Sequence, residues 1–159
     1  MQPAVTGAGP IPPAQAATQA RNRILFALIA ALSLAGVIDS AISLERHYAK
    51  SATRFCDFSQ RFSCDIVNRS EYSSIIGIPV AGIGVAGYGV LLALATLLRT
   101  RPQTPNRLLG AAIAGLAFAL YLTYVEAYVL ETWCILCLLS LVFISLISLL
   151  ALIVKLKAT

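Results

Sequence analysis

The sequence has little charge and almost no histidine. Only 12% of its 159 residues are charged, 58% are hydrophobic, and a single histidine, His47, is present. This composition is too apolar for an ordinary soluble domain. The sequence holds no cluster of cysteine and histidine, which argues against a structural zinc site. We therefore predict a membrane protein without a metal centre.

Acidic residues are scarcer than basic ones, with 7 Asp and Glu against 12 Lys and Arg and a net charge of +5. A nucleic-acid-binding protein would gather such an excess in a separate patch. Here the basic residues flank apolar segments instead, which is typical of membrane topology. We therefore expect contact with membrane lipid and no nucleic-acid partner.

Four apolar runs are long enough to cross a bilayer, which needs about 20 apolar residues per helix. They cover about residues 24–44, 75–98, 108–130 and 134–154. Residues 1–20 carry no charge, and their composition predicts a disordered tail before a domain at 21–157. The predicted fold class is an all-α membrane protein, a bundle of four transmembrane helices with an outer loop at 45–74 that carries a cysteine pair.

The distribution of charge predicts the orientation of this bundle. Three chain ends or turns, at 21–23, 99–107 and 155–157, carry seven basic residues and no acidic one. Charges in the opposite loops nearly balance. The positive-inside rule then places both termini in the cytoplasm and all four cysteines on the outer side, where disulfides persist. For a bacterial protein this is the inner membrane, with the cysteines facing the periplasm.

The first candidate site is the Cys-x-x-Cys pair Cys134 and Cys137, at the start of the last apolar run. A helix N-terminus stabilises thiolate and so activates sulfur. Thr132 can cap this start through the amide of Ile135. Cys137 lies about 4.5 Å deeper than Cys134 at the rise of an α-helix. We expect Cys134 to face water and Cys137 to face the membrane interior.

The second candidate site is the loop pair Cys56 and Cys64. Two cysteine pairs on one side of a membrane suggest a relay, in which a thiolate attacks a disulfide and electrons pass to the next pair. A quinone fits best as the final acceptor, because it dissolves in lipid and takes up two electrons. The alternative is a pair of structural disulfides that staple a loop. That alternative is weaker for the tight Cys134/Cys137 ring, since stabilisation by a disulfide grows with loop length.

Two ionisable residues, Asp39 and Glu126, lie inside apolar runs near their outer ends. Such residues usually face a cavity or a partner. They could supply protons to a reduced quinone, or they could extend to the interface as isolated charges do. Tyr124 belongs to a tyrosine stripe that forms either bundle core or a quinone wall.

Together these residues resemble the vitamin K epoxide reductase family over about residues 24–154. The resemblance lies in the two cysteine pairs with their spacing, in Ser70 after the loop pair, and in three short motifs. These motifs are Gly77-Ile78-Pro79, Tyr121-Leu122-Thr123-Tyr124-Val125-Glu126 and Trp133-Cys134-Ile135-Leu136-Cys137.

The resemblance implies that Cys56, Cys64, Cys134 and Cys137 are catalytic. In the family the second cysteine of the Cys-x-x-Cys reacts with the quinone, a role that falls to Cys137. Cys134 would exchange with the loop pair, and the loop pair with a periplasmic thioredoxin-fold (DsbA-like) protein. The quinone would be ubiquinone or menaquinone, with contacts expected from Ser70, Cys137, Val80, Leu141, Tyr124 and Glu126.

Two positions depart from the animal enzymes, which carry asparagine and tyrosine where this chain has Val80 and Leu141. This difference favours a bacterial-type enzyme that makes disulfides with a respiratory quinone as acceptor. A quinone or vitamin K epoxide reductase that runs on thiols is the alternative within the family. A disulfide-stapled structural membrane protein is the alternative of another class.

Overall fold

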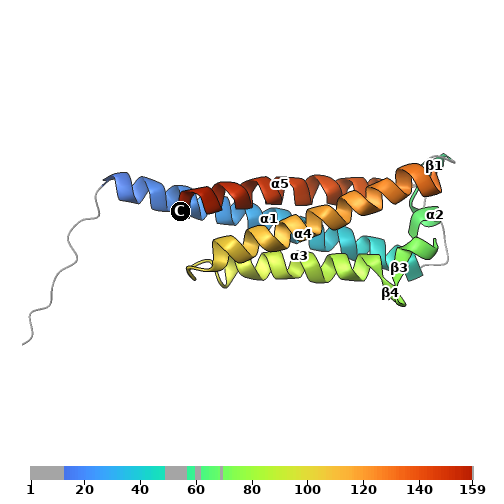
Figure 1. Cartoon of the computed structure of the whole chain (residues 1–159), viewed down its shortest axis with the longest axis horizontal. Coiled ribbons are helices and arrows are strands. Elements are labelled where there is room, and N and C mark those ends of the chain that lie inside the picture. The colour runs from blue at the N-terminus through green and yellow to red at the C-terminus, as the bar shows by residue number, and fades with distance from the viewer. Residues whose placement is uncertain (1–12, 49–56, 60–61, 69, 159) are drawn as a thin grey trace, which may run out of the picture.

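Four long helices lie side by side in the computed structural model, which describes residues 13–48, 57–59, 62–68 and 70–158 (Figure 1). They are α1 (Pro13–Tyr48), α3 (Val80–Thr96), α4 (Thr104–Val125) and α5 (Ile135–Ala158). Segments Gln19–Tyr48, Thr104–Leu130 and Ile135–Lys157 are long and apolar enough to cross a membrane, and α3 is a shorter apolar helix. The predicted fold class, an all-α membrane bundle, is confirmed.

The short elements gather at one end of the bundle, away from the end at which α5 terminates (Figure 1). A hairpin pairs β1 (Asp57–Ser59) with β2 (Phe62–Ser63), and a second pairs β3 (Ser74–Ile75) with β4 (Ile78–Pro79). Between the hairpins lie the short helix α2 (Cys64–Asn68) and the 3-10 turn η1 (Glu71–Ser73). We call this end the cysteine end, because Cys64, Cys134 and Cys137 lie there.

Helix boundaries differ from the sequence expectation most clearly at the starts of α1 and α3. Helix α1 begins at Pro13, inside the segment predicted to be disordered, because proline suits a first helical turn and the alanines and glutamines after it favour helix. Helix α3 begins at Val80, after the β3–β4 turn. That turn requires positive φ at Ile76 and Gly77, a backbone conformation that no helix contains.

The apolar core runs between all four helices. It includes Ile29 on α1, Leu91 on α3, Leu108 on α4 and Ile147 on α5, all nearly or fully buried. Helices α1 and α3 approach closely at Gly36, where an added Cβ would lie 2.4 Å from the Tyr88 ring. The absence of a side chain at this glycine therefore allows the tyrosine ring to pack against α1.

Gly36→Ala should destabilise the bundle, because the new methyl group displaces a ring that is hydrogen-bonded to α5. We expect a loss of about 1–3 kcal/mol, the usual range for overpacking a core. Thermal unfolding in detergent measures this. Gly89→Ala is the control, since a Cβ there meets no other described atom within 4 Å. An equal loss in both variants would contradict the close α1–α3 contact.

Candidate active site

The Cys134/Cys137 pair lies at the start of α5. The Leu138 amide donates to the Cys134 carbonyl at 3.0 Å, so Cys134 occupies the N-cap position and Cys137 lies in the first turn. Both residues carry thiols. Cys134 is 0% exposed, whereas Cys137 is half-buried and lines a cavity. The expectation that Cys134 faces water is therefore wrong for this reduced form, because α2 packs over it.

The residue that caps this helix start is Glu126, and the expected cap Thr132 acts elsewhere. The Cys134 amide donates to Glu126 Oε2 at 3.1 Å, while the Thr132 hydroxyl donates to the Leu130 carbonyl. Glu126 opens the π-helical turn η2 (Glu126–Leu130), which ends at Glu131 with a left-handed φ of 50°. This turn carries the chain from α4 back to α5 and keeps the Glu126 carboxylate beneath the cysteines.

Three sulfur atoms and one carboxylate form a hydrogen-bonded series. Cys64, in α2 and 1% exposed, is hydrogen-bonded to Cys134. Cys134 is hydrogen-bonded in turn to Cys137, whose thiol donates to the Glu126 carboxylate. The ligand atoms of Glu126, Cys134 and Cys137 all lie within 4.8 Å of one another. Cys134 thus occupies the middle of a path from the loop to the interior.

The loop partner of Cys134 is therefore Cys64. The other loop cysteine, Cys56, lies outside the residues that the structure describes. The close spacing of Glu126, Cys134 and Cys137 also suits a metal ion with thiolate ligands. The sequence expectation of no metal did not anticipate this juxtaposition.

The environment of Cys134 holds its proton in place. Its hydrogen bond to Cys137, together with burial, raises the pKa of the Cys134 thiol above the ordinary value. A neighbouring base must remove a proton before either sulfur of the pair becomes a nucleophile, and Glu126 is the carboxylate in contact with Cys137.

A cavity of about 430 Å³ opens beside Cys137. This volume lies within the ordinary range for small-molecule sites. Its walls are mostly apolar and come from α1, α3, α4 and α5. Polar and thiol side chains also line it: Asp39, Ser40, Ser43, His47, Ser70, Tyr72, Ser73, Tyr88, Glu126, Cys137 and Ser140. An apolar ring with polar oxygens at its edge fits such a space.

Four of the predicted contact residues line this cavity: Ser70, Val80, Glu126 and Cys137. The Ser70 hydroxyl donates to the Val67 carbonyl at 2.8 Å, which orders the turn after α2. Val80 contributes an apolar surface from the start of α3.

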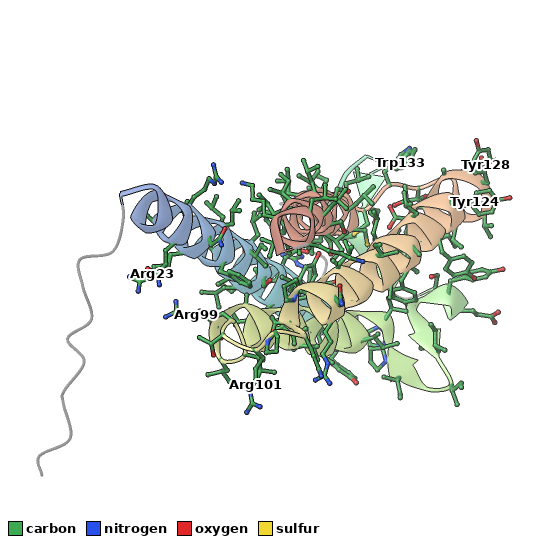
Figure 2. The ribbon with its side chains drawn as sticks, turned by 60° about the vertical axis from the view of Figure 1, so that its left-hand side comes forward. Arg23, Arg99, Arg101, Tyr124, Tyr128 and Trp133 are labelled. Atoms are coloured by element: carbon green, nitrogen blue, oxygen red, sulfur yellow. The ribbon has the colours of Figure 1, made fainter. Side chains whose placement is uncertain are left out.

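Two of the predicted contact residues, Tyr124 and Leu141, do not line this cavity. Tyr124 is 59% exposed and stacks on Tyr128 with ring centroids 4.9 Å apart, so the tyrosine stripe forms neither core nor cavity wall. Figure 2 shows both rings pointing away from the bundle. Leu141 is also not among the residues that line the cavity. The helical phase of α5 presents Ser140, one turn after Cys137, in its place.

Sequence reasoning missed two residues that contact each other across the cavity. The Tyr88 hydroxyl donates to the Ser140 carbonyl at 2.8 Å and lies 2.9 Å from Ser140 Oγ. Ser140 could have been found from its spacing, one turn along α5 from Cys137. Tyr88 carries no local signal, because only the packing of α1 against α3 turns it inward.

Double variants test the assignment of Cys64 as the partner of Cys134. Cys56→Ser with Cys137→Ser leaves only Cys64 and Cys134, which should form a disulfide readily under mild oxidation because their sulfurs are already in contact. Peptide mass spectrometry measures the linked fraction. Cys56→Ser with Cys134→Ser is the control and should link more slowly. Equal or reversed rates would contradict the order of sulfurs in the series.

Residues 27–152, most of the chain, match the family model described as the vitamin K epoxide reductase family. The matched segment contains most of the four long helices, all the residues that line the cavity and all four cysteines.

Proposed function

The chain belongs to the vitamin K epoxide reductase family, whose members are oxidoreductases linked to quinones, and on that premise we propose that it makes disulfides. It would take electrons from a periplasmic thioredoxin-fold (DsbA-like) protein and deliver them to a membrane quinone, ubiquinone or menaquinone. The observation that carries the proposal is the hydrogen-bonded series from Cys64 through Cys134 to Cys137, which ends at the apolar cavity.

The first transfer within the protein is a thiol–disulfide exchange. Cys64 thiolate attacks Cys134 of the Cys134–Cys137 disulfide, a bond forms between Cys64 and Cys134, and Cys137 leaves as thiolate. Attack by Cys56 on Cys64 then completes the loop disulfide and releases Cys134. One disulfide has formed and one has been reduced. The partner protein reduces the loop pair again by the same chemistry.

The second transfer oxidises the Cys134/Cys137 dithiol. A bound quinone supplies the two-electron oxidant. Cys137 is the sulfur that lines the cavity, whereas Cys134 is shielded by α2. Two S–H bonds would be broken and one S–S bond formed, and the quinone would take up the electron pair and two protons to become quinol.

The carboxylate of Glu126 is the proton acceptor for this step. Its carboxylate accepts the hydrogen bond of the Cys137 thiol and stays oriented by the Cys134 amide. A carboxylate that is 2% exposed and close to a thiol can take its proton as the sulfur attacks. The backbone bond to Cys134 keeps this geometry through the reaction.

The distribution of charge supports a periplasmic location for the cysteine end in a bacterial inner membrane. Figure 2 shows Arg23, Arg99 and Arg101 at one end of the bundle, with Trp133 and the tyrosines at the other. Basic residues favour the cytoplasmic side. A thioredoxin-fold partner in the periplasm would then reach the loop that bears Cys64.

Redox trapping of the thiols tests the proposal. The reduced protein in detergent receives a short-chain ubiquinone, and free thiols are then alkylated and counted by mass spectrometry. We expect quinone to convert all four cysteines to disulfides in the wild type, and Cys137→Ala to leave the remaining thiols reduced. A scaffold with structural disulfides predicts no response to quinone. A vitamin K epoxide reductase would also oxidise its thiol donor, and it differs by reducing an added quinone epoxide, which the proposed enzyme should leave unchanged.

Glu126→Gln tests the role of the carboxylate. Glutamine preserves an acceptor for the Cys134 amide but cannot take the Cys137 proton, so quinone reduction should slow about 100-fold, the usual scale of general base catalysis. Stopped-flow absorbance of the quinone measures the rate. Glu131→Gln is the control, because Glu131 is exposed and does not line the cavity. Similar rates in Glu126→Gln and the wild type would remove the base from the mechanism.

A further inference from the structure

A second carboxyl group lines the same cavity from the opposite helix. Asp39 on α1 is 5% exposed, and its Oδ1 atom has no hydrogen-bond partner among the described residues. An ionisable group inside a membrane segment is costly and usually serves a pathway or a ligand. Asp39 therefore offers an unsatisfied polar atom to whatever enters the cavity.

Asp39 is connected to the cysteine end by a polar stripe along α1. Asp39, Ser43 and His47 follow one another at intervals of four residues, so they lie on one side of the helix. All three line the cavity. His47 is close to the end of α1 at Tyr48, where the short elements of the cysteine end begin. The stripe thus leads from the aqueous end of the bundle to the buried carboxyl.

Asp39 is also linked, through Tyr88, to the helix that carries Cys137. It lies within electrostatic range of Tyr88, whose hydroxyl bonds to Ser140 on α5. Ser140 is one turn beyond Cys137. The cavity is thus lined by Asp39 from α1, by Glu126 from η2 and by Cys137 from α5, with the Tyr88–Ser140 hydrogen bond linking α3 to α5. A quinone bound in this cavity would therefore meet carboxyl groups from two separate segments of the chain.

We propose that Asp39 is the proton donor to the quinone oxygen remote from Cys137, supplied with protons along Ser43 and His47. This inference rests on the proposed function. One thiol proton reaches the nearer oxygen through Glu126, and Asp39 gives its proton to the other. The second thiol proton leaves to water, and one proton returns to Asp39 along the stripe. Two S–H bonds are lost and two O–H bonds are formed.

Asp39→Asn tests the proposal, because asparagine has the same shape but no proton to give. We expect quinol formation to slow about 100-fold while the KM for a short-chain ubiquinone changes by less than about threefold. Asp39→Glu should restore most of the rate. Glu45→Gln is the matched control: Glu45 is on the same helix, exposed and outside the cavity.

The pH profile separates a proton donor from a structural residue. A donor must be protonated, so the wild-type rate should fall at high pH, and this fall should be absent in Asp39→Asn. The other titratable groups that line the cavity stay in place in this variant. They are His47 on α1, Tyr72 on η1, Tyr88 on α3, Glu126 on η2 and Cys137 on α5. An unchanged profile would overturn the proposal.

A labelling experiment that needs no quinone turnover completes the test. Dicyclohexylcarbodiimide modifies protonated carboxyl groups in apolar surroundings, and mass spectrometry locates the adduct. We expect modification of Asp39 in quinone-free protein, protection by short-chain ubiquinone and no adduct at Glu45. An unmodified Asp39, or one that quinone does not protect, would overturn the inference.

The proposed function and the role of Asp39 are refuted by different results. A wild type that does not reduce quinone with its thiols removes the proposed function itself. A wild type that does so, with Asp39→Asn as fast as Glu45→Gln, removes only the role of Asp39.

Discussion

The carboxylate of Glu126 is the contact on which the active site depends. It accepts the backbone amide of Cys134 and the thiol of Cys137, so one side chain fixes both members of the pair. The π-helical turn that Glu126 begins, and the left-handed Glu131 that ends it, return the chain so that α5 starts directly above this carboxylate. An irregular turn is tolerated there because it lines a cavity and carries function.

The membrane setting explains why the polar groups of the cavity are few. Apolar walls exclude water, so each remaining carboxyl or hydroxyl group acts in surroundings where charge is costly and proton transfers are directed. Glu126 serves the sulfur side, and Tyr88 with Ser140 ties α3 to α5 below it. In the proposed function, electrons reach Cys134 by exchange with Cys64 and leave at Cys137, and the burial of Cys134 keeps the entry and the exit apart.

Much of the fold could be predicted from the sequence, because long apolar runs and flanking charges have one stable arrangement in a bilayer. The pair Cys134 and Cys137 could be placed at a helix start for the same local reason. The orientation of individual side chains could not. Tyr124 and Glu126 are two residues apart on a helix, so only one of the two side chains can face the cavity. The change from α-helix to π-helix at Glu126 shifts the helical phase, so the sequence does not show which of them it is. Burial of Cys134 depends on α2, and the place of Tyr88 depends on Gly36, both contacts between segments distant in sequence.

The central claim is that, of the three described thiols Cys64, Cys134 and Cys137, Cys137 alone meets the quinone. A naphthoquinone with an open ring position adds to a thiol that it reaches, and peptide mass spectrometry of the reduced protein identifies that thiol. The account predicts an adduct on Cys137, with Cys64 and Cys134 unmodified. An adduct on Cys134 or Cys64, with Cys137 unmodified, would contradict it.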